Sequence, residues 1–259
     1  MFATERRNTI LAALREERHV VVSDLARRFD VSEETIRRDL DRMEKDGYVV
    51  KMYGGAVLSE NAAAEQPYAV RKKSHVEAKQ AIAELAAELV SDGDTLILDA
   101  SSTALFIAGR LRTKKDITLI TNSVEVLMEL ADVPGWKVLS TGGLLKERSY
   151  ALVGSRAEEY LSSFHVDKAF ISCKGVDAER GFTDTDDAHA AVKRKMLACA
   201  SQVFFAVDSS KFGRRSFTTI SPFSGIAAVL TERAPDDEWS RLFAANDVEC
   251  LFPEEVKHG

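Results

Sequence analysis

The apolar residues between positions 20 and 57 follow a helical spacing twice, in two short runs. Those of the first run lie on one side of a helix: Leu25, Ala26 and Phe29. Those of the second recur at i, i+4 and i+7: Ile36, Leu40 and Met43. We place the turn between them at Asp30-Val31, with Val31 facing inward, and expect Ser23 and Ser32 to cap the helices. The pattern therefore predicts a helix-turn-helix.

The polar side of the second helix carries several cations. Glu33 and Glu34 stand in its first turn, where carboxylates suit the positive end of the helix dipole. The residues that face away from the apolar stripe are Thr35, Arg37, Arg38 and Arg42, with Lys45 one turn further on. A charged helix face is most often only solvated surface. Here, however, it belongs to the second helix of a correctly spaced pair.

A β wing is expected to follow this helix. Gly47 should end the helix, residues 48–52 should form a strand, and Gly54-Gly55 should reverse the chain. A winged helix-turn-helix serves mainly to place one helix in the major groove of DNA. We therefore predict contacts with a double-stranded DNA operator from these residues: Ser23, Ser32, Thr35, Arg37, Arg38, Arg42, Lys51 and Tyr53.

The charge balance limits this prediction. The chain has 35 Lys+Arg against 41 Asp+Glu, and residues 1–58 contain 11 of each sign. The cations of that region must therefore gather on one face, as Arg38, Arg42 and Lys45 do, to neutralise phosphates. One such domain should bind DNA modestly. We expect a homodimer or homotetramer, because two-fold symmetry matches palindromic sites.

A second, larger domain follows a linker. Residues 59–74 lack apolar periodicity and contain Pro67, so we divide the chain into a winged helix-turn-helix domain (1–58), a linker (59–74) and an effector-sensing domain (75–259). In the last, amphipathic helices alternate with short apolar runs at 95–99, 117–120, 136–139, 168–172, 203–208 and 227–230. Such alternation predicts an α/β fold, with a mostly parallel sheet covered on both faces.

Polar residues follow five of these strands where each one ends. The carboxyl ends of parallel strands lie along one edge, where ligands bind. Hydroxyl groups, free backbone N–H groups and lysines suit a phosphate, while aspartates can hydrogen-bond sugar hydroxyls. A phosphorylated sugar or polyol effector is therefore predicted to bind here: Asp99, Ser101, Ser102, Thr103, Thr121, Asn122, Ser123, Gly142, Gly143, Lys174, Gly175, Asp208 and Lys211. Each loop alone is more simply a helix cap or a solvated surface, so the prediction rests on five loops meeting at one edge.

An acidic loop precedes a helix near position 188. Asp184, Asp186 and Asp187 permit divalent metal binding, but carboxylates before a helix most often cap it, and we favour that interpretation. His189 lies in the first turn of the same helix and by itself indicates little. We expect no metal and no cofactor.

Composition places the chain among ordinary soluble globular proteins, with 45% hydrophobic and 29% charged residues. No stretch approaches the ~20 apolar residues of a membrane span, and the charged N-terminus lacks a secretory apolar region. The three cysteines are too far apart to suggest a zinc site or a disulfide framework. We expect a cytoplasmic protein without membrane contact.

Short runs of the sequence match one family. In the first domain these are Ser23-Asp24-Leu25-Ala26, Val31-Ser32, Thr35-Ile36-Arg37-Arg38-Asp39-Leu40 and Gly54-Gly55-Ala56. In the larger domain they include Gly93-Asp94-Thr95, Val153-Gly154, Val166-Asp167-Lys168-Ala169-Phe170, Val192-Lys193 and Asp208-Ser209-Ser210-Lys211-Phe212. With these runs the chain resembles the DeoR family of bacterial transcription regulators. The resemblance implies a sensor domain related in fold to ribose-5-phosphate isomerase, whose loops bind a sugar phosphate that alters DNA affinity. The family usually has glycine where this chain has Ser101, so backbone approach to a phosphate is expected to differ there.

Three classes of function are compatible with these features. The leading one is a repressor of a carbohydrate-utilisation operon whose effector binds two states with different affinity, as inducer or corepressor. The second is a sugar-phosphate isomerase fused to a DNA-binding domain, with Asp99 or Asp208 as general base and Lys211 as electrostatic clamp. No compact acid–base group stands out, so we expect no enzyme activity. The third is an oligomerising architectural DNA binder with a vestigial pocket.

Overall fold

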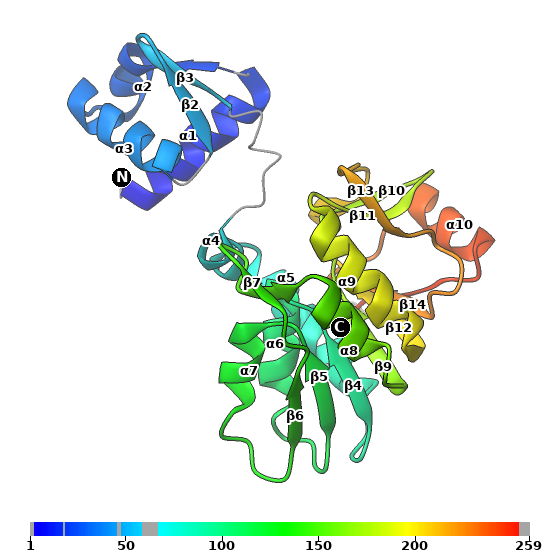
Figure 1. Cartoon of the computed structure of the whole chain (residues 1–259). Helices are drawn as coiled ribbons and strands as arrows, with labels where there is room; N and C mark the ends of the chain where they lie inside the picture. The colour runs from blue at the N-terminus through cyan, green and yellow to red at the C-terminus, as the bar shows by residue number, and fades with distance from the viewer. Residues whose placement is uncertain (1–2, 18, 46–47, 59–66, 254–259) are drawn as a thin grey trace, which may run out of the picture. The chain divides into compact units, whose positions relative to one another are not determined.

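The chain folds as two compact units. The computed structural model describes residues 3–17, 19–45, 48–58 and 67–253, and the units are Met1–Pro67 and Tyr68–Gly259 (Figure 1). The C-terminal unit begins earlier than position 75, because the end of the expected linker forms helix α4 (Tyr68–Lys73).

The N-terminal unit packs helices on a small sheet with strand order β1-β3-β2. Its elements are α1 (Ala3–Glu17), β1 (His19–Val21), α2 (Val22–Phe29), α3 (Glu33–Lys45), β2 (Val49–Met52) and β3 (Gly55–Leu58). The predicted apolar residues are buried: Leu25, Ala26, Ile36, Leu40 and Met43. The helix-turn-helix and the wing are thus confirmed, whereas α1 and β1 were not predicted.

The start of α2 corrects one prediction. Val21, not Ser23, is the N-cap residue, and no side chain makes a capping hydrogen bond. Instead the N–H of Val22 donates to the carbonyl of Gly54 in the wing at 2.9 Å. Gly55 permits this close approach, because a Cβ there would lie 2.1 Å from the carbonyl oxygen of Val20.

The C-terminal unit is built on a seven-stranded sheet with strand order β15-β14-β12-β9-β4-β5-β6. Every pair of neighbours in it is parallel. Its strands are β4 (Thr95–Leu98), β5 (Thr118–Thr121), β6 (Lys137–Ser140), β9 (Val166–Ile171), β12 (Ala200–Ala206), β14 (Ala228–Leu230) and β15 (Glu249–Leu251). The six strands predicted from the sequence are confirmed, and β15 adds an edge strand.

Helices cover both faces of this sheet (Figure 1). One core lies under α5 (Val76–Glu88), α6 (Ser102–Leu111) and α7 (Val124–Leu130). The other lies under α8 (Ser155–Leu161), α9 (Asp187–Ala198) and α10 (Asp237–Ala245). Leu96 and Leu98 of β4 belong to the first core and Ile97 to the second, because successive strand residues point to opposite faces.

Two small antiparallel elements were not predicted. One is the hairpin of β7 (Leu144–Lys146) and β8 (Ala151–Val153). The other is the sheet β10-β11-β13, formed by Gly175–Asp177, Gly181–Asp184 and Thr218–Ser221. Their strands are three or four residues long, too short for an alternating pattern to be recognised.

Candidate DNA-binding surface and effector site

Helix α3 presents the polar face that the sequence predicted. Ser32 caps it, because its Oγ accepts a hydrogen bond from the N–H of Thr35 at 3.2 Å. Thr35 is half-buried, and three arginines of the helix are exposed: Arg37, Arg38 and Arg42. Asp39, which the sequence analysis left without a role, is buried and pairs with Arg6 of α1 at 2.5 Å. This ion pair fixes the position of α3 on α1.

Two of the exposed arginines of α3 pair with glutamates of the same helix. Arg37 pairs with Glu33 at 2.6 Å and Arg38 lies 3.4 Å from Glu34. Both pairs have the i,i+4 spacing at which helix side chains meet, so these ion pairs could have been predicted from the sequence. Exposed pairs of this kind contribute at most about 1 kcal/mol. DNA phosphates can therefore replace the glutamates at small cost.

The wing offers a cation and an exposed ring. The ammonium of Lys51 pairs with Asp41, and a hydrogen bond with this carboxylate raises the pKa of Lys51. Tyr53 at the turn is fully exposed and follows Met52, which is 60% exposed. Ser23 is half-buried in the first turn of α2. The side chain of Lys45, and Gly47, lie outside the described residues.

The five predicted loops lie at one edge of the large sheet. They follow β6, β5, β4, β9 and β12, which are consecutive neighbours in the strand order. Because all five strands run in the same direction, their carboxyl ends meet at that edge. The convergence that the effector prediction required is therefore present.

Most hydroxyl groups at this edge are already used by the fold. Ser101 caps α6 by accepting from the N–H of Ala104 at 3.0 Å, and Ser123 caps α7 in the same way. Thr121 Oγ1 accepts from the N–H of Ser123 at 3.1 Å. Ser102 and Thr103 are buried in the first turn of α6. These side chains shape the base of the edge.

Asp99 is part of a buried ionic cluster that the sequence analysis did not find. It is fully buried, accepts from the backbone N–H groups of Ser101 and Ser172, and lies 3.4 Å from the ammonium of Lys193. Lys193 also donates to Asp184 at 2.7 Å. Burial acts to lower the pKa of Lys193, but the charges of Asp184 and Asp99 outweigh it and raise that pKa above its usual range. The cluster ties the ends of β4 and β9 to α9 and β11.

The available signal for this cluster was a lysine on an apolar helix face. The buried side of α9 consists of His189, Ala190, Val192, Lys193 and Met196. A lysine at such a position has to meet a carboxylate, because an unpaired charge is too costly to bury.

Cations gather beside this cluster around Asp208. Lys211 lies 3.5 Å from Asp208 and donates to the hydroxyl of Ser172 at 3.2 Å. Lys79, which was not predicted, is buried on α5 and donates to the carbonyls of Arg71 and Ser74 at the end of α4. Burial and the positive charge of Lys211 lower the pKa of Lys79 to about 8.

Two further cations act on the same ammonium. Arg71 and Lys174 also lower the pKa of Lys79, while Asp208 opposes them. Burial acts to raise the pKa of Asp208, but Lys211 and a hydrogen bond from Ser210 outweigh it, so the carboxylate stays charged. The arrangement has an excess of positive charge in partly buried surroundings.

The glycines of the edge serve different purposes. Gly142 has φ +63 and open space around its Cβ position, so its backbone is accessible. A Cβ on Gly143 would lie 2.6 Å from the carbonyl oxygen of Val153, and one on Gly175 would lie 2.3 Å from that of Arg214. Gly143 and Gly175 are therefore required by packing.

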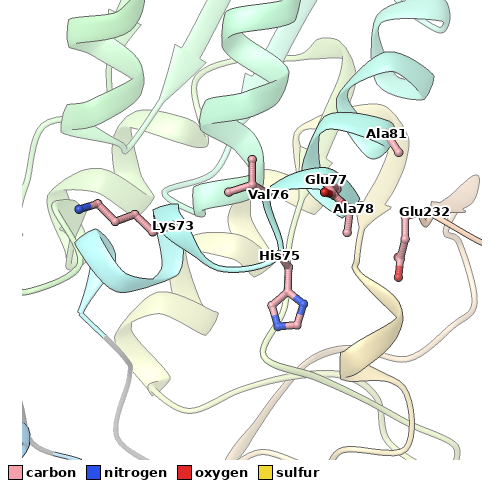
Figure 2. A pocket seen from close by; sticks show the side chains of 7 residues that line it. All are labelled: Lys73, His75, Val76, Glu77, Ala78, Ala81 and Glu232. Atoms are coloured by element: carbon pink, nitrogen blue, oxygen red, sulfur yellow. The ribbon is translucent and has the colours of Figure 1, made fainter. Parts of the chain in front are cut away.

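A hollow of about 580 Å³ opens between the start of α5 and the loop at Glu232 (Figure 2). Its lining residues are Lys73, His75, Val76, Glu77, Ala78, Ala81 and Glu232. Glu232 accepts from the N–H of Ser209 at 2.9 Å, so the hollow adjoins the loop that carries Asp208 and Lys211. Among the described residues that line this hollow, none is a predicted effector residue.

The acidic loop before α9 follows the capping interpretation at Asp186 and Asp187, whereas Asp184 pairs with Lys193 instead. Asp186 is the N-cap and accepts from the N–H of His189 at 3.1 Å, while Asp187 begins the helix. Among the residues that the structure describes, no group of three or more His, Cys, Asp or Glu side chains is arranged to hold a metal ion. No helix in the described ranges is long and apolar enough to cross a membrane.

Family models match both units of the chain. A model of the DeoR-like helix-turn-helix domain matches residues 6–62, and one of the DeoR C terminal sensor domain matches residues 74–233. The chain is 36% identical to the HTH-type transcriptional repressor GlcR of Bacillus subtilis over 98% of each chain. It is 28% identical to the glycerol-3-phosphate regulon repressor of Escherichia coli, over 91% of this chain and 93% of that one. Among solved structures, ribose 5-phosphate isomerase A of Methanocaldococcus jannaschii matches 52% of this chain and 53% of that one, at 20% identity and a TM-score of 0.38.

Proposed function

Because this chain belongs to the DeoR family of DNA-binding transcriptional regulators, we propose that it represses a carbohydrate-utilisation operon under the control of a phosphorylated sugar or polyol. The relatives support this, since one is named a transcriptional repressor and another the repressor of a glycerol-3-phosphate regulon. The protein acts in the cytoplasm, where it meets its operator.

The cation cluster around Asp208 is the observation that carries the effector proposal. The positive charges of Lys211, Arg71 and Lys174 act on the ammonium of Lys79 at the carboxyl edge of the sheet, and the charge of Asp208 partly offsets them. A phosphate dianion would relieve the rest, and lysine ammonium groups are common phosphate ligands. Asp208 is left to accept hydrogen bonds from sugar hydroxyls.

The remaining predicted residues divide between contact and support. We assign ligand contact to the accessible groups of the edge, namely Gly142, Lys174 and Lys211, and to the buried carboxylate of Asp208 beside Lys211. Asp99, Ser101, Thr121 and Ser123 have their polar groups engaged within the fold. They support the proposal by holding the loops in place.

Thermal shift and operator binding of the Lys211→Ala variant test this assignment. Phosphorylated sugars and polyols should raise the melting temperature of the wild-type protein, because a ligand that binds the native state stabilises it. Lys211→Ala should lose that shift and the operator response, yet keep full operator affinity without ligand. Lys137→Ala, which removes an exposed lysine at the opposite end of β6, is the matched control. A normal ligand response in Lys211→Ala would place the site elsewhere.

Binding without turnover is the part of this proposal that separates it from an isomerase. A general base has to reach the proton that it removes, but Asp99 is fully buried and held by two backbone N–H groups. Asp208 is charged, and its ion-pair partner is the cation Lys211 rather than a second acid. Isomerisation of any sugar phosphate by the purified protein would contradict this.

DNA recognition is assigned to α3 and the wing. The exposed arginines of α3 face away from the core, and the helix-turn-helix places such a face in the major groove. One unit covers a single half-site, so we propose that a homodimer or homotetramer binds a two-fold symmetric operator.

A further inference from the structure

Two buried polar atoms beside the effector edge lack a hydrogen-bond partner among the described residues. They are the phenolic oxygen of Tyr68 on α4 and Oδ1 of Asn122 after β5. Tyr68 is 1% exposed and Asn122 is 3% exposed. Leaving such a group unpaired costs about 1–3 kcal/mol, and nearly all buried polar groups are paired. The pair of them calls for an explanation.

One short segment holds both side chains. The N–H of Tyr68 donates to the carbonyl of Arg148 at 2.7 Å, and its ring meets that of Tyr150 edge-on at 5.7 Å. Asn122 exchanges two hydrogen bonds with Leu152, its carbonyl accepting at 2.7 Å and its Nδ2 donating at 3.0 Å. Because Nδ2 is used in this way, Oδ1 is the atom left for another partner.

The charges that act on Tyr68 belong to residues of the same edge of the sheet. Burial and the charges of Glu125 and Asp99 raise the pKa of Tyr68 above its usual range. Glu125 lies in the first turn of α7, and Asp99 follows β4. The phenol therefore keeps its proton at neutral pH and is available as a donor near the carboxyl ends of β4 and β5.

We propose that Tyr68 and Asn122 bind hydroxyl groups of the effector, with the phenol donating and the amide oxygen accepting. Together they offer one donor and one acceptor, which suits a ligand with more than one hydroxyl group. The inference rests on the effector function proposed above. It adds a site for the hydroxylated part of the ligand to the cations that hold its phosphate.

This assignment makes α4 part of the effector site. Residues 59–67 connect β3 of the N-terminal unit to α4, so α4 is the first helix of the C-terminal unit after the connection. Tyr68, at the start of α4, is almost fully covered, so a ligand can reach its hydroxyl only if α4 moves relative to the elements that cover it. The carbonyls of Arg71 and Ser74, at the other end of α4, are held by Lys79. Ligand binding is thereby linked to the position of this helix.

Pairs of phosphate esters that differ only in their hydroxyls test the inference. The probes are glycerol 3-phosphate beside propyl phosphate, and glucitol 6-phosphate beside hexyl phosphate, titrated by calorimetry. The wild-type protein should prefer at least one hydroxylated ester over its alkyl partner. Tyr68→Phe should lose about 2- to 12-fold of that preference, the equivalent of one hydrogen bond, and leave the affinity for the alkyl phosphate unchanged. Asn122→Ala should likewise reduce the preference for the hydroxylated ester. A general loosening of the site would instead weaken the binding of both esters of a pair, so the comparison separates the two effects.

Tyr150→Phe is the matched control, because it removes a hydroxyl from the neighbouring ring, which is 43% exposed. It should retain the wild-type preference. A preference that survives in Tyr68→Phe would overturn this inference and leave the effector function standing. If none of the four esters binds the wild-type protein, the effector function fails, and this inference fails with it.

Discussion

Replacing Lys193 by methionine should destabilise the C-terminal unit, because two buried carboxylates then lose their cation. Asp99 and Asp184 are each at most 1% exposed, and Lys193 lies 3.4 Å and 2.7 Å from them. Breaking a buried ion pair by removing one partner costs about 3–5 kcal/mol. Backbone N–H groups still serve both carboxylates, those of Ser101 and Ser172 on Asp99 and that of Thr185 on Asp184. We therefore expect a loss near the lower end, about 3 kcal/mol. Methionine is similar in length to lysine, so little of the loss should come from a cavity.

The free energy of unfolding of the variant should also change with pH in a defined direction. Burial acts to raise the pKa of Asp184, but Lys193 and Lys174 outweigh it and hold that pKa below 3.8, while the pKa of Lys193 lies above 10.5. The pair therefore stabilises the wild-type fold between about pH 4 and about pH 10.5. That contribution is lost as pH falls through the folded pKa of Asp184 or rises through that of Lys193. In Lys193→Met the burial of Asp184 is no longer opposed by that cation, so the pKa of Asp184 should rise. The variant should then gain stability as pH falls from 7 to 5.

Urea unfolding followed by tryptophan fluorescence measures the stability of the C-terminal unit. The chain has two tryptophans, Trp136 and Trp239, and both belong to the C-terminal unit. Lys137→Met, at an exposed position of β6, controls for the substitution itself. A loss below 1 kcal/mol at pH 7, or a further loss between pH 7 and pH 5, would refute the reasoning.

Two other substitutions test the surface and the edge. Arg38→Ala or Arg37→Ala should cost about 1–3 kcal/mol of operator binding, measured by fluorescence anisotropy, if the arginine contacts a base. Thermal unfolding should be unchanged, and full operator affinity in both variants would remove α3 from the interface. Gly175→Ala should lower the melting temperature and weaken effector binding, since its Cβ would lie 2.3 Å from the carbonyl oxygen of Arg214 and displace the loop after Lys211. Gly109→Ala, whose Cβ would meet nothing nearer than 3.7 Å in helix α6, should be neutral or stabilising, and equal behaviour of the two variants would contradict the packing argument.

The sequence was informative where one local pattern decides the structure. Six strands of the sheet were predictable because each is a short apolar run before a polar loop, and parallel order then brings the loops together. It could not say which polar groups remain available to a ligand. Ser101 and Ser123 carry hydroxyl groups of the kind that bind phosphate, yet each of these groups caps a helix.

The groups that could not be predicted from the sequence depend on contacts between different elements. Lys79 meets carbonyls of the preceding helix, Lys193 meets Asp99 across 94 positions, and Tyr68 lies against Tyr150. Periodicity describes one element at a time, so it cannot show such partners. The signal that the sequence contains for each of them is a charged or polar residue at a buried position.

The ion pairs on α3 weaken the attraction of a single N-terminal unit for DNA, so that operator binding depends on two units acting together. Phosphates have to displace Glu33 and Glu34 from Arg37 and Arg38, and residues 1–58 have no net charge. One copy of the N-terminal unit therefore has little electrostatic affinity for DNA by itself. In the oligomer that we propose, the second unit binds at high effective concentration, which can add about 10²- to 10⁴-fold in affinity. This gain vanishes when the geometry forbids both units to bind at once. An effector that moves α4, and thereby prevents both units from binding at once, can thus release the operator while the DNA-contacting residues of each unit stay the same.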